Sequence, residues 1–149
     1  MELKTLIHNA CIESLNEKIM SLNALFNDLN VGMQNDAKST AGDKHETARA
    51  MAQIEIDKIS KQLHESNLMK TALLKIDINF ISDKIIQGSL IRTDKGIFYL
   101  SIALGKIIVE DIAVMVLSPM SPFGRKLIGL KVNDSVQVNA TNYHIQHII

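Results

Sequence analysis

Large apolar residues in the first quarter of the chain recur at alternating spacings of three and four positions. They are Ile12, Leu15, Ile19, Leu22, Phe26, Leu29 and Met33. This spacing is typical of a coiled coil, because it places the apolar side chains in one narrow stripe along a helix. The stretch contains no proline, and its first glycine is Gly32. The pattern therefore predicts a long helix from Glu2 to about Gln34.

A second helical pattern extends from about Asp43 to Lys75. Its apolar stripe consists of Ala52, Ile56, Ile59 and Leu63. Two narrow stripes joined by a short polar connection can bury each other if the helices fold back as an antiparallel hairpin. About 30 residues at about 1.5 Å each would make a rod roughly 45 Å long, with its tip at about 35–42. Pairing of the same stripes between two molecules is the alternative interpretation.

After about Ile76 the pattern changes to one typical of β-strands. Two strands are expected on either side of the turn signal at 93–96, and one long strand is expected over 106–118. A short helix is then expected to begin at Pro122, because proline suits the first helical turn and Ser121 can cap it.

The last part of the chain contains a turn signal at 132–135, followed by short strands at 136–140 and 143–149. Together these elements predict an antiparallel sheet with one short helix packed on it. The fold class is therefore α+β, with a helical hairpin over 1–76 and a sheet domain over 77–149.

The composition limits the kinds of function that the chain can perform. It has 149 residues, of which 46% are hydrophobic, and this is enough to bury a core. Its 16 basic and 16 acidic residues cancel, so a surface that grips duplex nucleic acid through its phosphates is not expected. Cys11 is the single cysteine, which excludes an intrachain disulfide and a multi-cysteine zinc site. We expect Cys11 to be a buried structural residue.

The start of the sequence and its longest apolar run do not suggest export or membrane insertion. Charges occur throughout the first fifteen residues, unlike in a signal peptide. The longest apolar run is interrupted by Glu110 and Asp111, and it is shorter than the roughly 20 residues that span a bilayer. We expect a cytoplasmic protein that does not associate with membranes.

The predicted tip of the hairpin carries three carboxylates, on Asp36, Asp43 and Glu46. Two structural explanations compete with a functional one. Asp43 and Glu46 are spaced as in a capping box and would meet the positive end of a helix dipole. Asp36 would equally suit a turn in which its side chain bonds to the backbone. The pattern alone leaves both interpretations open.

No self-sufficient active site is visible in the sequence. The five histidines show no metal-ligand spacing with acids or with the cysteine, and no glycine-rich phosphate loop occurs. Ser118 and Ser121 lack the glycines of a nucleophile elbow. With no tryptophan and few aromatic residues in the second half, an aromatic-lined pocket for proline is hard to assemble there. These residues are Phe80, Phe98, Tyr99, Phe123 and Tyr143.

The stretch from Ser118 to Val138, SPMSPFGRKLIGLKVNDSVQV, resembles the C-terminal signature of the Gre family of bacterial transcript-cleavage factors. The matching residues are Leu127, Ile128, Gly129, Lys131, Val132 and Asp134. In this chain Leu130 is inserted before the lysine and Asn133 replaces the usual glycine. Asparagine tolerates a positive φ better than most residues, so the turn is expected to survive.

The resemblance implies a transcription elongation factor whose C-terminal domain is FKBP-like and has no isomerase activity. In such factors the hairpin enters the secondary channel of RNA polymerase, and acids at its tip help to hold a catalytic magnesium ion. For this chain that implies Asp43, Glu46 and Asp36 as residues that assist the polymerase's metal. Magnesium is then supplied by the polymerase active site, and the chain has no cofactor of its own. We expect a monomer that stimulates cleavage of backtracked RNA without being an enzyme itself.

The tip departs from the family pattern in one respect. If the second helices are aligned through Ala48 and Arg49, the two acidic positions of the family fall near Lys38 and Ala41. The acids of this chain are displaced toward the second helix, while basic side chains such as Lys38 and Arg49 are available for local contact with nascent RNA. An inhibitor that binds in the channel and a non-catalytic coiled-coil interaction module are the alternatives.

Overall fold

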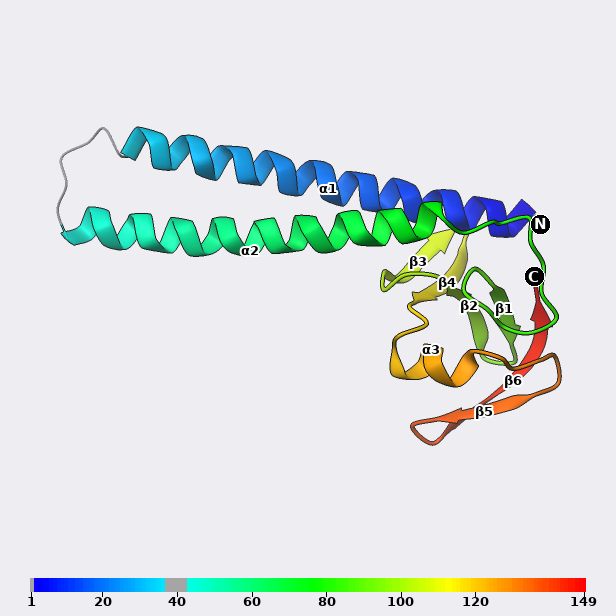
Figure 1. Ribbon diagram of the computed structural model, residues 1–149. Helices are drawn as coiled ribbons and strands as arrows, with labels where there is room; N and C mark the ends of the chain where they lie inside the picture. The colour runs from blue at the N-terminus through cyan, green and yellow to red at the C-terminus, as the bar shows by residue number, and fades with distance from the viewer. Residues whose placement is uncertain (1, 37–42) are drawn as a thin grey trace. The chain divides into compact units, whose positions relative to one another are not determined.

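The computed structural model describes residues 2–36 and 43–149, except for the side chains of residues 36 and 43–45. In the described part, two long helices are followed by a six-stranded mixed sheet and one short helix, as Figure 1 shows. The α+β class is therefore confirmed. The chain divides into two compact units. The hairpin unit is Ser14–Leu68, and the sheet unit consists of Met1–Glu13 and Met69–Ile149.

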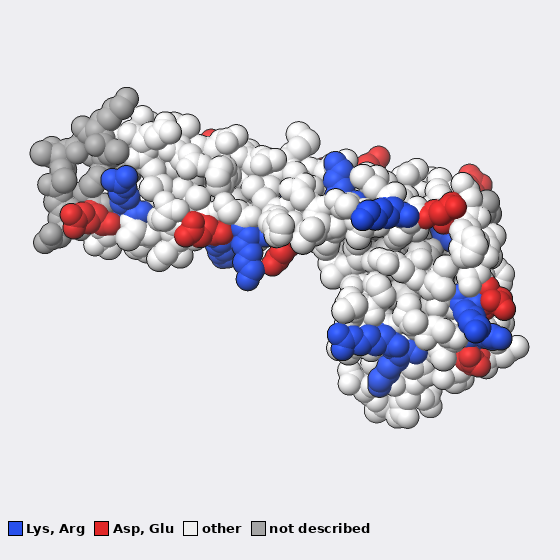
Figure 2. Space-filling view, in the orientation of Figure 1, with Lys and Arg blue, Asp and Glu red and all other residues white. Residues whose placement is uncertain are grey.

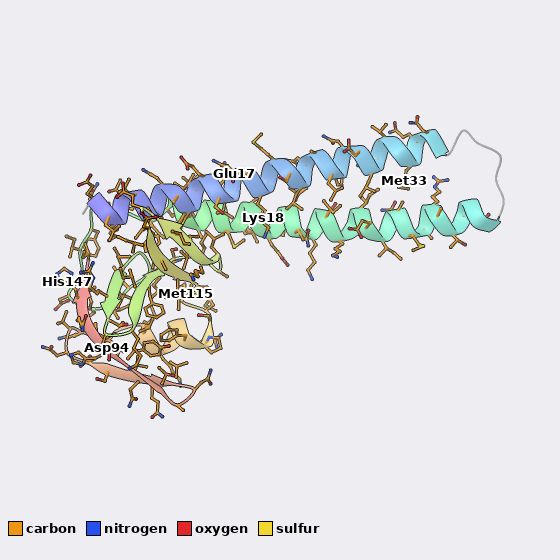
Figure 3. The ribbon with its side chains drawn as sticks, turned by 180° about the vertical axis from the view of Figure 1, so that it is seen from behind. Glu17, Lys18, Met33, Asp94, Met115 and His147 are labelled. Carbon is orange, nitrogen blue, oxygen red and sulfur yellow. The ribbon has the colours of Figure 1, made fainter. Side chains whose placement is uncertain are left out.

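Helix α1 spans Glu2–Asp36 and helix α2 spans Asp43–Leu74. Within the hairpin unit the two helices lie side by side and run in opposite directions (Figures 1 and 3). In the apolar stripe of α1, Leu15 is buried and the other residues are half-buried, and on α2 the stripe residues Ile56 and Ile59 are buried. The spacing of apolar residues thus predicted both helices and the face that each one buries.

The sheet has the strand order β3-β4-β2-β1-β6-β5. Its strands are β1 Leu90–Thr93, β2 Gly96–Leu100, β3 Gly105–Val109, β4 Ile112–Leu117, β5 Ser135–Val138 and β6 Thr141–Ile148. Strands β1 and β2 form a hairpin around the turn predicted at 93–96. Strands β5 and β6 pair as a second hairpin. The first hairpin confirms the turn predicted at 93–96. The second turns at Asn139 and Ala140, which have φ values of 50° and 66°, whereas the sequence pattern placed these two residues in the strand expected over 136–140.

The expectation of a purely antiparallel sheet is wrong, because β2 and β4 pair in parallel. Strand β3 lies at the edge of the sheet, and β4 lies between β3 and β2. After β2 the chain therefore forms the edge strand first and then returns as β4 beside β2. The expected long strand over 106–118 is also wrong, since it is divided into the antiparallel pair β3 and β4. The turn residues Glu110 and Asp111 have φ values of 49° and 64°. Two successive positive φ angles suit a tight hairpin turn, which ordinarily selects glycine or asparagine.

Helix α3 spans Pro122–Leu127 and begins as the sequence predicted. The backbone N–H of Gly124 donates to the Ser121 hydroxyl at 3.0 Å, and that hydroxyl donates to the carbonyl of Ser118 at 2.6 Å. The serine therefore caps the helix and also ties it to the preceding loop. Asn133, in the turn predicted at 132–135, has a φ of 78°, a conformation that asparagine tolerates better than most residues.

The core of the sheet unit lies between the sheet and α3. Its fully buried members include Ile91, Leu100, Leu127 and Ile145. The opposite face of the sheet carries Tyr99, whose hydroxyl reaches a side chain of α1. No helix among residues 2–36 and 43–149 has the length and apolarity needed to cross a membrane.

Candidate functional site at the hairpin tip

The predicted acidic site falls at the two helix ends of the hairpin unit. Asp36 is the last residue of α1, and Asp43 is the first residue of α2. The side chains of both lie outside the described residues. Their positions along the backbone are informative, because a helix dipole favours a carboxylate at its N-terminus and disfavours one at its C-terminus. The dipole therefore explains Asp43 as a structural residue and does not explain Asp36.

Glu46 is the candidate whose side chain the structure describes. It lies in the first turns of α2, is exposed, and has no hydrogen-bond or ion-pair partner among the described residues. It lines a hollow of about 320 Å³ together with Met33, Arg49, Ala50 and Gln53. Figure 2 shows acidic and basic side chains close together at this end of the hairpin. The Glu46 carboxylate is thus free to bind a cation or a hydrogen-bond donor from outside the chain.

The hollow has a simple origin in the sequence. The apolar stripe of α2 ends at Ala52, and the next position of the series toward the tip is Arg49. Met33 on α1 therefore faces a segment that has no large apolar side chain to pack against it. Near the tip the two helices lose the apolar seam that joins them further along, and polar groups occupy its place.

The structure brings only part of the predicted site together. Glu46 and Arg49 line the same hollow, whereas Asp36 and Asp43 cannot be compared with them. Among the described residues, no three or more histidine, cysteine, aspartate or glutamate side chains are grouped so that they could hold a metal ion. Glu46 alone supplies too few ligands, because magnesium takes six oxygen ligands in near-octahedral geometry.

A buried polar cluster in the sheet unit was not predicted from the sequence. Lys4 and His8 lie one helical turn apart on α1 and are only 2% and 6% exposed. The Lys4 ammonium donates to the backbone carbonyl of Ile149 at 3.1 Å, and the His8 Nδ1 atom lies 2.7 Å from the Tyr99 hydroxyl. These contacts fix the first turns of α1 to strand β2 and to the residue that follows β6 in the same unit.

Burial changes the ionisation of this cluster. It lowers the pKa of Lys4, with Asp77 acting in the opposite direction, and it lowers the pKa of His8, to which the Lys4 charge adds. Burial also raises the pKa of Cys11 to about 11 and raises the pKa of Tyr99. Cys11 is therefore an unreactive thiol, and its predicted structural burial is confirmed.

One signal in the sequence pointed to this cluster. His8 lies four residues before Ile12 and so continues the alternating series of the apolar stripe. A histidine in such a position is expected to be buried, and a buried imidazole needs a hydrogen-bond partner. The partner, Tyr99, is 91 positions away, and nothing in the local sequence identifies it.

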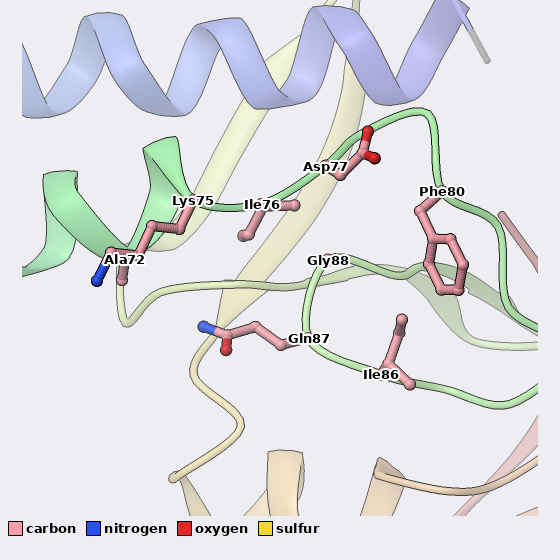
Figure 4. Close-up of a pocket in the computed structure, with 8 residues that line it drawn as sticks. All are labelled: Ala72, Lys75, Ile76, Asp77, Phe80, Ile86, Gln87 and Gly88. Atoms are coloured by element: carbon pink, nitrogen blue, oxygen red, sulfur yellow. The ribbon is translucent and has the colours of Figure 1, made fainter.

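A second hollow, of about 230 Å³, lies where the chain leaves α2 within the sheet unit (Figure 4). Lys75, Asp77, Phe80 and Gln87 are among its lining residues. The glycine at its wall, Gly88, has a φ of 101°, and a Cβ there would lie 2.7 Å from the Ile76 side chain. The hollow brings together one cation, one carboxylate and an amide without a nucleophile, so its geometry indicates a packing junction.

No protein-family model, curated protein or solved structure matches the chain. Any family relationship therefore rests on the motif between Ser118 and Val138 and on the order of helices and strands. The function is argued below from those features and from the geometry of the tip.

Proposed function

We propose that the chain is a Gre-like transcription elongation factor that binds RNA polymerase. In this proposal it inserts the hairpin tip into the secondary channel and stimulates cleavage of backtracked RNA. The observation that carries the proposal is the exposed carboxylate of Glu46, which has no partner among the described side chains and lies beside the end of a hairpin of two long helices. In this proposal the carboxylate is one ligand of a metal ion whose other ligands come from the polymerase.

The dimensions of the hairpin suit delivery of a group into a narrow channel. Helices α1 and α2 contain 35 and 32 residues, and at about 1.5 Å per residue each is about 50 Å long. The helices bury only one stripe each, so the hairpin has a small cross-section along its length. A small cross-section and a long reach are what entry into a channel requires.

The proposed chemistry belongs to the polymerase. Magnesium prefers hard oxygen ligands and usually keeps several waters, so one or two carboxylates from a second protein can complete its coordination. Glu46, with Asp43 and Asp36 as further candidates, would orient the ion and its hydrolytic water. This division explains why the chain needs no cofactor of its own and no nucleophile.

We propose that the sheet unit has an FKBP-like fold and that it is the docking domain of the factor. Support comes from the capped helix α3 lying against a sheet of six strands, and from the motif that follows the helix. The positive φ of Asn133 preserves the turn in which the family ordinarily uses glycine. The fold is proposed without isomerase activity, because activity belongs to a site and not to a fold.

The test is a transcript-shortening assay on a purified backtracked elongation complex with magnesium. The wild-type chain should co-purify with core polymerase as a monomer and shorten the RNA. The variants Asp43→Ala and Glu46→Ala should bind equally well and lose most of the stimulation. A chain that does not bind core polymerase would refute the proposal.

A channel-binding inhibitor is the second candidate, favoured by the sequence of the tip. The positions that carry acids in the family fall near Lys38 and Ala41 in this chain, so the carboxylates are shifted along the hairpin. An inhibitor would bind core polymerase and slow the intrinsic cleavage of backtracked RNA. A non-catalytic coiled-coil interaction module would instead form a stable homodimer in light scattering and would not bind polymerase.

A further inference from the structure

The face of the sheet that packs against α3 is left uncovered toward β3 and β4. Phe98 contacts Phe123 of α3, with the ring centroids 5.0 Å apart. Met115 is paired in register with Phe98 and therefore points to the same face. Helix α3 has only six residues, and Met115 remains 41% exposed (Figure 3). On β3 the apolar side chain of Ile108 is 68% exposed.

A hollow of about 270 Å³ lies on this open part of the sheet. Phe98, Ala113, Met115 and Tyr143 contribute apolar and aromatic walls, and Lys95 and Lys106 also line it. We call these six residues the β4 surface. Its two aromatic residues, Phe98 and Tyr143, come from strands that are distant in the sequence.

The aromatic rings of this wall pack against one another. The Phe98 and Tyr143 centroids are 5.6 Å apart in an edge-on arrangement, and Phe123 lies 5.0 Å from Tyr143. Such contacts fix the ring positions. The wall is thus preorganised, which reduces the entropy lost when a partner binds.

The charged residues that line the β4 surface are two lysines, Lys95 and Lys106. The segments of β2, β3, β4 and α3 contain Lys106, Arg125 and Lys126 and no aspartate or glutamate. Figure 2 shows basic side chains gathered over α3 with no acidic side chain beside them. The carboxylates closest in the sequence are that of Asp94, which is bound to Lys95 and to the backbone of His144, and those of Glu110 and Asp111 in the turn between β3 and β4. Lys106 has no partner among the described residues.

We propose that the β4 surface binds an acidic amphipathic peptide segment of a partner protein. Apolar side chains of the segment fill the hollow against Met115 and Phe98, and its carboxylates face Lys106 and the basic end of α3. The pattern is that of an interface with an apolar centre and a charged rim. The inference does not depend on the proposed action of the hairpin tip.

The same surface fits single-stranded RNA less well. Bases bind proteins by stacking on the faces of aromatic rings, whereas the rings here contact one another and the Lys95 ammonium lies over the ring of Tyr143. The acidic segment is therefore the occupant to which the proposal commits. RNA and a second copy of the chain are tested as outcomes that would refute it.

The experiment measures fluorescence anisotropy of a labelled synthetic peptide in which leucine and phenylalanine alternate with glutamate and aspartate. The full chain should bind this peptide, and binding should weaken as salt is raised. Met115→Glu should weaken it at least about tenfold and Lys106→Glu about fivefold, because each places a negative charge against the carboxylates of the peptide. The controls Val132→Glu and Lys84→Glu change an equally exposed apolar residue and another lysine, and should alter binding less than about twofold.

Three results would overturn the proposal. Equal binding of a peptide with lysine at every acidic position would show that charge plays no part. Tighter binding of labelled oligouridylate, abolished by the same two variants, would assign the surface to RNA. A dimer in light scattering that Met115→Glu dissociates would assign it to a second copy of the chain. Because the assay contains no polymerase, its failure leaves the transcript-shortening test unaffected.

Discussion

In the hairpin unit, the described apolar side chains that are fully buried are Leu15, Ile56 and Ile59, and most other members of the stripe are half-buried. The sheet unit instead contains a contiguous core on one face of its sheet and a buried polar cluster on the other. Apolar burial stabilises by roughly 25 cal/mol per Å², so the two units are expected to differ in local stability. The hairpin unit consists of long helices with few buried apolar side chains. The sheet unit contains the larger core and is expected to be the more stable of the two.

The difference is largest near the hairpin tip. The apolar stripe of α2 stops at Ala52, and Glu46 and Arg49 line a hollow instead of a packed seam. A helix pair with few buried apolar contacts opens locally at lower free energy than a core strand. The end of the hairpin that carries the candidate carboxylates is therefore also its least stable described part.

The largest expected effect comes from a cavity in the sheet core. Leu100 is fully buried, and Leu100→Ala should lower the free energy of unfolding by about 2–5 kcal/mol. The half-buried stripe residue Leu29 provides the comparison. Leu29→Ala should lower the free energy of unfolding by about 1 kcal/mol, because Leu29 buries less apolar surface on folding than Leu100 does. Urea denaturation of both variants measures the difference. Equal losses would contradict the contrast between the two units.

A smaller loss is expected at the start of α3. A Cβ on Gly124 would lie 2.1 Å from the Ser118 carbonyl oxygen, so the backbone of the cap must shift. Gly124→Ala should cost about 1–3 kcal/mol, again measured by urea denaturation. As a control, Gly32→Ala on α1, where the space around a Cβ is open, should be neutral or stabilising because alanine favours the helix.

Acidification should weaken the sheet unit through His8. Burial and the neighbouring Lys4 charge lower the pKa of His8 in the folded chain, whereas an unfolded histidine has a pKa of about 6.5. Below that pH the unfolded chain binds more protons, so the contribution of His8 to stability is complete above pH 6.5 and is lost progressively as the pH falls. Urea midpoints between pH 7 and pH 5 measure the loss. His8→Gln should flatten this slope, and the exposed control His64→Gln should retain it.

The smallest effect has the opposite sign and lies in the hairpin unit. The hydroxyl of Ser66 is fully buried and has no hydrogen-bond partner among the described atoms. Ser66→Ala should raise the free energy of unfolding by about 0.5–1.5 kcal/mol, because it removes an unsatisfied group and improves helix propensity. Ser60→Ala on the exposed side of α2 is the control and should gain less. A destabilised Ser66→Ala variant would reveal a hydroxyl contact that this account lacks.

Local patterns in the sequence predicted the helices and most of the strand ends. Repeats of apolar residues specify the buried face of a helix, and Thr93 to Gly96 specifies a turn through its own residues. The break at Glu110 and Asp111 was not predicted, since a turn with two successive positive φ angles usually contains glycine and glutamate rarely adopts such an angle. The parallel pairing of β2 and β4 also has no signature in the local sequence. It depends on β3 taking the edge position, so that β4 lies next to β2.

The candidate site also has one feature that the local sequence predicted and others that depend on contacts between distant segments. The sequence indicated Glu46 because the acid stands beside the connection between two helical patterns. It could not indicate that the stripe of α2 would leave a hollow at Arg49, nor that His8 would meet Tyr99 across 91 positions. Contacts between distant segments determine both features, and periodicity within one segment carries no information about them.

The most direct test of the central claim is the rate of RNA shortening in a backtracked elongation complex with magnesium, compared between Glu46→Gln and Glu55→Gln. Both residues are exposed glutamates of α2, and only Glu46 lies near the tip. The account predicts that Glu55→Gln stimulates cleavage like the wild type, whereas Glu46→Gln binds polymerase normally and stimulates at least about tenfold less. Equal stimulation by both variants would contradict the assignment of Glu46 to the polymerase's metal site.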